Sequence, residues 1–342
     1  MLTLKLVAQI KGKPDSMGLS DDGHWLVMTY GDEWHLIDAF TGQEIGRVPD
    51  FSGFISPDGR SFALLKNGTL KVTRLDGSQI EKTYPYPTGK YPGSMVCFTA
   101  DSQRLWVTLW DEHGAGKLAL LDAGTLEEID SVPVPVAEGD DEITWVNPEM
   151  SLHMPTDTLA LQHVYSDFRG LLGVFFFNHQ EKQIKQLPVY IAPDSALSFM
   201  SETAFSASGQ LFAGIVGGRE VWVWQMNNMD HDELLNVCDI DNDEENDRAY
   251  WIRGGDRLAG LTFLSEQLIV LVERKSRYEL RVVDIINDSV VSRYQLPHDF
   301  TLMDYSLRVQ TLVDNSLRGQ TLVGIQGDDV VIYRLSVAKE TI

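Results

Sequence analysis

One phrase of sequence recurs along the chain: a polar turn leads into a short apolar strand, and a second turn leads into a second strand. In the clearest copy, the turn Ser-Pro-Asp-Gly at 56–59 precedes the apolar residues 62–65, the turn 66–69 and the strand residues 70–75. Self-similarity at a regular period is the signature of a repeat architecture, in which each copy buries its apolar surface against its neighbours. The chain is therefore expected to fold as a series of packed copies of one β unit.

Seven copies of this phrase can be counted. The strand that follows the polar turn begins at residues 26, 62, 105, 159, 211, 268 and 322. Subtraction gives spacings of 36, 43, 54, 52, 57 and 54 residues between successive starts. Sharing 342 residues among seven copies gives roughly 49 each, near the length of a β-propeller blade.

The strands in these copies are continuous apolar runs, which is typical of strands covered on both faces by neighbouring sheets. We predict an all-β fold: a seven-bladed β-propeller of four-stranded antiparallel blades that forms one domain over 1–342. The copy across 143–180 is the least regular, so counts of six or eight blades are kept as alternatives.

A ring of blades needs closure. Each copy ends in a more polar strand, such as 43–48 or 183–187, and the segment 4–10 has this character although it precedes the first complete copy. The chain also ends soon after the third strand of the last copy. We therefore predict that the N-terminal strand completes the last blade and leaves no open sheet edge.

The turn 56–59 resembles the Ser-Pro-Asp-Gly turn of bacterial WD-repeat-like propellers. The residues 223–225 and 283–284 lie where that family often places Trp-Asp. This resemblance covers nearly the whole chain as a pattern, although no copy carries both a Gly-His start and a Trp-Asp end. The resemblance implies a scaffold that binds protein partners.

The charge of the chain bears on its partners. It has 50 acidic and 28 basic side chains, a formal net charge of −22, and 10% aromatic residues that distinguish it from an acidic disordered chain. Such a field repels nucleic acid and anionic lipid and attracts cationic partners. The absence of a signal peptide or membrane-spanning run, and two cysteines (Cys97 and Cys238) in apolar surroundings, predict a cytoplasmic protein.

A search for motifs of catalysis or cofactor binding finds none. The eight histidines lack metal-ligand spacing, and 239–243 begins like an EF-hand calcium loop that Glu244 and Tyr250 then break. A Gly-x-Ser-x-Gly turn and a glycine-rich phosphate loop are also missing. We predict no catalytic residue, no metal and no cofactor. The alternative is a hydrolase or lyase with carboxylates gathered in the central channel.

Acidic and aromatic residues gather in the loops between second and third strands and in the connectors between blades, which share one face of a propeller. Lys275, Arg277 and Arg219 interrupt this pattern. We predict a face that binds a basic protein, with aromatic anchors and steering carboxylates. The predicted partner-binding residues are Tyr84, Tyr86, Tyr91, Trp110, Asp111, Glu112, Asp140, Asp141, Glu142, Asp241, Asp243, Trp251, Asp328 and Asp329.

Other interpretations of this surface are kept beside that prediction. The acidic loops can serve solubility alone, and Tyr-Pro loops can pack on their own blade. A narrower form of the binding hypothesis is an immunity protein that neutralises a cationic toxin. A subunit of a larger assembly is a third alternative.

Overall fold

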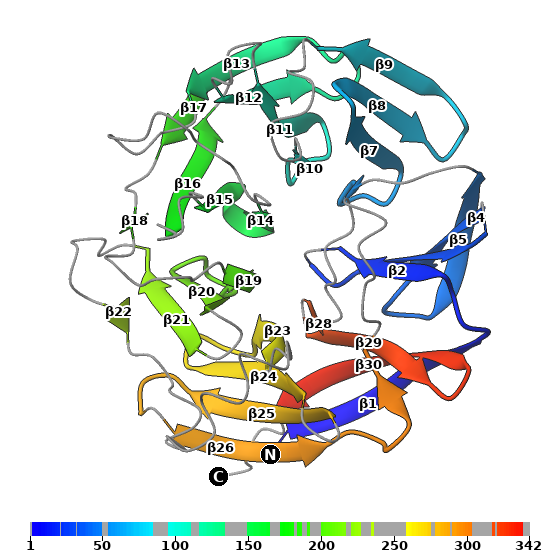
Figure 1. Cartoon of the computed structure of the whole chain (residues 1–342), viewed down its shortest axis with the longest axis vertical. Coiled ribbons are helices and arrows are strands. Elements are labelled where there is room, and N and C mark those ends of the chain that lie inside the picture. The colour runs from blue at the N-terminus through cyan, green and yellow to red at the C-terminus, as the bar shows by residue number, and fades with distance from the viewer. Residues whose placement is uncertain are drawn as a thin grey trace.

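The computed structural model describes residues 2–20, 22–31, 33–49, 54–84, 95–110, 116–133, 149–164, 172–180, 183–186, 190–191, 200–216, 220–226, 234–235, 258–274, 278–287, 289–302, 317–318 and 320–337. These residues form seven antiparallel sheets that are arranged around a central axis as the blades of a β-propeller (Figure 1). The one helix within these ranges is the short 3-10 turn η1 (Met154–Thr156).

In each blade the strands follow one another outward from the axis (Figure 1). Blade 1 holds β2 (Ser16–Leu19), β3 (Trp25–Tyr30), β4 (Glu33–Asp38) and β5 (Gln43–Pro49). Blade 2 holds β6 (Phe54–Ile55), β7 (Ser61–Lys66), β8 (Thr69–Arg74) and β9 (Gln79–Thr83). Blade 3 holds β10 (Val96–Phe98), β11 (Arg104–Trp110), β12 (Gly116–Asp122) and β13 (Glu128–Pro133).

Blade 4 holds β14 (Glu149–His153), β15 (Thr158–Val164), β16 (Leu172–Gln180) and an outer position shared by β17 (Gln183–Gln186) and β18 (Tyr190–Ile191). Blade 5 holds β19 (Met200–Phe205), β20 (Leu211–Val216), β21 (Glu220–Gln225) and β22 (Leu234–Leu235). Blade 6 holds β23 (Leu258–Phe263), β24 (Leu268–Arg274), β25 (Tyr278–Asp284) and β26 (Ser289–Gln295).

Blade 7 closes the ring. Its innermost position is shared by β27 (Phe300–Thr301) and β28 (Leu317–Arg318), followed by β29 (Thr321–Gln326), β30 (Asp329–Val337) and β1 (Leu2–Lys11). The register of β1 on β30 runs from the pair Leu2 and Val337 to the pair Lys11 and Asp329. The predictions of seven four-stranded blades and of closure by the N-terminal strand are therefore confirmed.

The irregular fourth copy is also a complete blade. The apolar residues expected to form its strands lie in β15 and β16, with Leu159 opposite Phe177. Its innermost strand is β14, and η1 with Asp157 replaces the turn found in the other blades. The alternatives of six and eight blades are thereby excluded.

The Ser-Pro-Asp-Gly turn is stabilised by its own side chains. The Ser56 hydroxyl donates to Asp58 Oδ1 (2.6 Å) and accepts the backbone N–H of Ser61 (2.9 Å). Asp58 Oδ1 also accepts the N–H of Arg60 (3.0 Å), and Gly59 takes a φ of +69°, which a residue without a Cβ adopts at little cost. The equivalent turns of blades 1 and 3 repeat these contacts with Ser20 and Asp22, and with Thr99 and Asp101.

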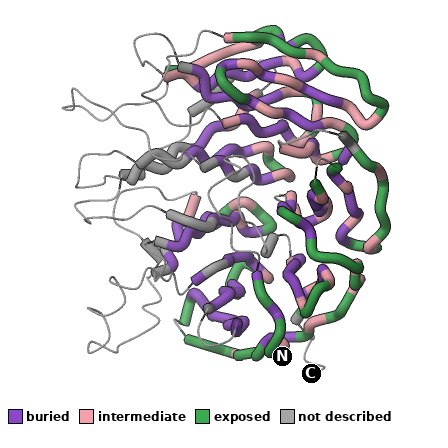
Figure 2. The backbone as a smooth tube through the Cα atoms, turned by 45° about the vertical axis from the view of Figure 1, so that its right-hand side comes forward, coloured by how far each residue is buried: buried purple, intermediate pink, exposed green. Residues whose placement is uncertain are grey.

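The core lies between neighbouring blades. In β24, Ile269 and Leu271 pack in a cluster with blade 5, whereas Val270 and Val272 pack in a cluster with blade 7. Both faces of the strand are thus buried, which explains why its sequence is an apolar run rather than an alternating pattern. Figure 2 shows burial through the inner strands and exposure along outer strands such as β26.

Candidate functional site

The antiparallel order of the strands gives the propeller two different faces. The turn face carries the turns from first to second strands and from third to fourth strands, including 56–60 and 122–127. The connector face carries the loops from second to third strands, and the connectors between blades begin and end there. The predicted partner-binding residues belong to the connector face.

Hydrogen bonds link neighbouring blades along the turn face. Six of the seven blade junctions have such a contact among the described residues. The donors and acceptors are Trp25 Nε1 to Pro57 O (2.8 Å), Asp58 N to Ser102 Oγ (3.1 Å), Ala100 N to Asp157 Oδ1 (2.9 Å), His153 Nε2 to Ala207 O (3.2 Å), Ser208 N to Glu266 Oε1 (3.0 Å) and Thr321 Oγ1 to Gly23 O (2.9 Å). The turn face is therefore a hydrogen-bonded rim.

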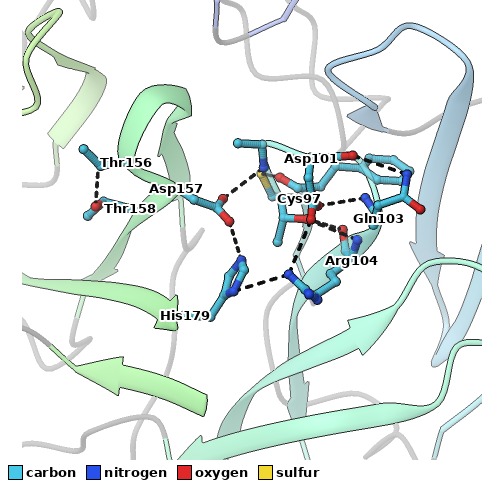
Figure 3. A network of polar contacts seen from close by, with 11 residues as sticks. Cys97, Asp101, Gln103, Arg104, Thr156, Asp157, Thr158 and His179 are labelled. Atoms are coloured by element: carbon cyan, nitrogen blue, oxygen red, sulfur yellow. Dashed lines mark hydrogen bonds and ion pairs between the residues drawn. The ribbon is translucent and has the colours of Figure 1, made fainter. Parts of the chain in front are cut away.

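Blades 3 and 4 are joined by a chain of charged side chains on this rim (Figure 3). Asp157 Oδ2 contacts His179 Nε2, and His179 Nδ1 lies 3.5 Å from Arg104 Nη1, which is 3.4 Å from Asp101 Oδ2. A guanidinium only donates, so Nδ1 of His179 accepts and Nε2 carries the hydrogen toward Asp157. The second imidazole nitrogen thus faces a cation, whereas a nucleophilic site would place a hydroxyl or thiol there.

On the connector face, the structure describes the side chains of three predicted residues. Asp328 is exposed at the tip of the β29–β30 turn. Asp329 accepts hydrogen bonds from Gln9 Nε2 (2.8 Å) and from the backbone N–H of Gly12 (3.3 Å), which fasten the end of β1. Asp329 therefore has a structural role.

Tyr84 is half buried and contacts the neighbouring blade. Its hydroxyl donates to the carbonyl of Leu126 (3.1 Å) in the β12–β13 turn, and its ring packs against the core between blades 2 and 3. Burial, together with the charge of Glu128, raises the pKa of Tyr84 to about 12. Tyr84 is therefore packed at the junction of blades 2 and 3, and not on its own blade alone.

Trp110 ends β11, where its backbone pairs with Gly116, and its side chain lies outside the described residues. The other predicted residues also lie outside them: Tyr86, Tyr91, Asp111, Glu112, Asp140, Asp141, Glu142, Asp241, Asp243 and Trp251.

The described part of the connector face carries both signs of charge. Its carboxylates include Asp15 and Glu33 beside Asp328 and Asp329. Three exposed lysines that the sequence analysis did not consider, Lys11, Lys13 and Lys66, lie at the same ends of the strands. The described part of the connector face is therefore not uniformly acidic.

A pocket of about 390 Å³ lies at the centre of the turn face, formed by residues that are far apart in the sequence. Small-molecule sites commonly enclose roughly 300–1,000 Å³. The described residues that line it come from blades 1, 4, 5, 6 and 7, and they include Asp22, Phe40, His153, Phe205, Phe263 and Arg334. Its wall is mostly apolar and holds a few polar groups, as binding pockets do.

The histidine of this pocket is neutral at pH 7. Its Nε2 donates to Ala207 O, and its Nδ1 lies 2.6 Å from the Thr156 hydroxyl, which donates to it. Burial lowers the pKa of His153 below its usual value. Both ring nitrogens are engaged in structural hydrogen bonds, so His153 supports the junction of blades 4 and 5.

The acidity of the carboxyl groups bears on the alternative of a hydrolase or lyase. The pKa is lowered for every described carboxyl group whose pKa departs from its ordinary value: Glu44, Asp76, Asp101, Glu128, Glu266 and Asp284. For example, the hydrogen bond from Asn287 lowers the pKa of Asp284, and that from Arg47 lowers the pKa of Glu44. A general acid needs a raised pKa. Carboxyl groups with a lowered pKa stay ionised at neutral pH, and an ionised carboxylate only accepts hydrogen bonds.

Within the described ranges, no three His, Cys, Asp or Glu side chains converge to hold a metal ion, and no helix has the length and apolar character needed to span a membrane. No protein-family model matches the chain, and no curated protein matches it.

Proposed function

We propose that the protein is a non-catalytic binding propeller that takes a cationic protein partner on its connector face. The observation that carries this proposal is the difference between the two faces. Aspartates of the turn face, such as Asp58 and Asp122, accept hydrogen bonds from the backbone of their own turns. Those carboxylates stabilise their own turns.

The connectors between blades add a large share of the acidic side chains. Residues 134–148 contain four acidic side chains and no basic one, and residues 236–257 contain seven acidic side chains against three basic ones, Arg248, Arg253 and Arg257. Both segments join strands whose ends lie at the connector face. Clustered negative charge of this kind increases the association rate with basic proteins and makes binding sensitive to salt.

Two narrower statements belong to the same proposal. The hydroxyl–aspartate turns of blades 1, 2 and 3 support a relationship with WD-repeat-like propellers, whose blades serve as protein scaffolds. A cytoplasmic protein that neutralises a cationic toxin is the specific form that the charge best fits, because such a toxin presents the complementary surface.

The proposal is tested by capturing partners from the native lysate with the purified protein, at low and at high salt. We expect one basic protein that is retained at low salt and weakened at high salt. Failure to retain any specific partner at either salt contradicts the proposal.

A matched pair of variants then locates the binding face. D140N/D141N removes two charges from a connector, and E81Q/E127Q removes two from exposed positions on β9 and the β12–β13 turn. We expect D140N/D141N to weaken binding of the captured partner and to reduce its salt dependence, with E81Q/E127Q close to wild type. Equal losses in both variants would mean that only the overall charge matters.

A further inference from the structure

The pocket at the centre of the turn face holds a guanidinium in a fixed position. Arg334 Nη1 donates to the Thr321 hydroxyl (2.6 Å), and the guanidinium lies 4.2 Å from the centre of the Phe40 ring. Phe40 is itself stacked on His24, with ring centres 4.4 Å apart and planes 7° from parallel. A guanidinium held in this way is preorganised to bind a carboxylate, because a planar fork of N–H donors matches the two carboxylate oxygens.

A carboxylate lies on the same side of the pocket. Asp22 accepts hydrogen bonds from the Ser20 hydroxyl (2.6 Å) and the His24 N–H (2.9 Å), and both go to Oδ1. Its charge acts on Arg334, whose pKa is lowered by burial and raised by Asp22. The pocket lining thus includes one positive and one negative group whose charges interact.

The opposite wall of the pocket is apolar and rigid. Phe205 lines it and is supported from behind by Phe212, with ring centres 4.8 Å apart, and by Phe176, at 6.2 Å. Phe263 and Leu152 continue this wall. An apolar side chain of a ligand is desolvated there at little conformational cost, because the aromatic residues are already packed in place.

We infer that this pocket binds a small zwitterion with an apolar side chain, of the α-amino acid class. The ligand carboxylate binds Arg334, its ammonium group binds Asp22, and its side chain packs on Phe205 and Phe263. A net-neutral ligand also fits a protein whose formal charge is −22, since that field disfavours simple anions. This inference concerns the turn face and does not depend on the proposed protein partner of the connector face.

The test is titration calorimetry with three probes that share one side chain. L-Phenylalanine carries both charges, 3-phenylpropanoate carries the carboxylate alone, and phenethylamine carries the ammonium alone. We expect saturable binding of L-phenylalanine at one site per chain, and about tenfold or more weaker binding of the other two probes, because each loses a charge-assisted hydrogen bond.

Variants assign the two charges. R334Q is expected to weaken L-phenylalanine about tenfold or more, and R334K by less, because the charge is kept and the fork is lost. D22N keeps Oδ1 as the acceptor for the turn, so we expect a folded protein that binds L-phenylalanine weakly and 3-phenylpropanoate no worse than wild type does. R60Q, at an exposed arginine of the same face outside the pocket, serves as the control and should bind as wild type.

Two results would overturn the inference. One is the absence of saturable binding of L-phenylalanine by the wild-type protein. The other is binding of 3-phenylpropanoate as tight as that of L-phenylalanine together with no effect of D22N, which would make the pocket a site for simple carboxylates. Thermal melting of each variant, measured beside the titrations, separates a loss of binding from a loss of fold.

Discussion

Substitution of Gly42 by alanine tests how the N-terminal strand closes the ring. Gly42 lies in the β4–β5 turn of blade 1 with a φ of +74°, and its N–H donates to Asp38 O (2.7 Å). A Cβ at this position would overlap the Cβ of Ala8, which lies at the irregularity in the pairing of β1 with β30. The atom in the way is on a short side chain next to the backbone, so it cannot move aside without moving the strand.

The expected cost of G42A has two parts. A residue with a Cβ in the left-handed region costs about 1 kcal/mol relative to glycine, and overpacking of a fixed core costs typically about 1–3 kcal/mol. The free energy of unfolding should therefore fall by about 2–4 kcal/mol. Urea denaturation followed by tryptophan fluorescence measures this change through a shift of the midpoint at constant slope.

Two further variants separate the two parts. Gly77 also has a positive φ, +83°, but a Cβ there would meet no atom within 4 Å, so G77A should cost only the backbone strain of about 1 kcal/mol. In the double variant A8G/G42A the new Cβ meets only the Cα at position 8, at 3.6 Å, an ordinary contact. We expect the double variant to lose at least about 1 kcal/mol less than the sum of the single variants.

Additive losses of unfolding free energy in A8G and G42A would contradict a contact between β1 and the β4–β5 turn. If G42A costs no more than G77A, or if A8G and G42A add within about 0.5 kcal/mol, then β1 does not pack against the turn of blade 1. Closure of the ring by the N-terminal strand would then need another explanation.

Three other substitutions test the turn face. S56A removes a buried hydroxyl that both donates to Asp58 and accepts the N–H of Ser61, so urea denaturation should show a loss of about 1–3 kcal/mol, whereas S78A in an exposed turn should lose less. W25F removes the donor to Pro57 O between blades 1 and 2 and should cost about 1–2 kcal/mol by the same assay, with W25A costing more. Burial lowers the pKa of His153 in the folded state, so at acid pH the unfolded chain takes up a proton that the folded protein does not. The free energy of unfolding should therefore fall as the pH drops from 7.5 through about 6.5 toward 5. H153Q should show a smaller fall over this range, and an unchanged fall would assign the acid sensitivity to another group.

The blade strands could be predicted because their physical signal is local. The starts expected at 26, 105 and 268 agree within one residue with β3, β11 and β24. Each is an apolar run bounded by turn residues, and burial on both faces leaves such a run without polar interruptions. The innermost strands are harder to predict from the sequence, because β6 and β27 have only two residues each and show no periodicity.

Charged residues inside strands show where pattern reasoning fails. Arg281 lies in the third strand of blade 6, where an isolated arginine is usually exposed, yet it is 2% exposed. Its Nη2 lies 2.6 Å from Glu273 Oε2 on the paired strand, and its Nε lies 3.3 Å from Glu279 Oε1. The burial depends on a partner across the sheet, and that pairing is known only once the register is known.

The pocket could not be predicted from spacing. Arg334 and Phe40 lie at opposite ends of the sequence and meet because β1 extends blade 7 and brings it against blade 1. At the closing junction the sequence separation is largest, as for Thr321 and Gly23, whereas the other junctions join residues of consecutive blades. The candidate residues on the connector face were identifiable by composition alone, but their composition carries no information about packing, as Tyr84 demonstrates.

The different properties of the turn face and the connector face follow from the closure of the ring of blades. A ring without an open edge distributes its stability over seven blade junctions, and hydrogen bonds of the turn face link six of them among the described residues. The turns that make those contacts must stay short and keep their hydroxyl and carboxylate side chains. Among the described residues, the connectors take part in fewer of these contacts, although Tyr84 packs between blades 2 and 3. Sequence length and charge are therefore free to vary there, and a partner-binding surface built on the connectors does not compete with the stability of the fold.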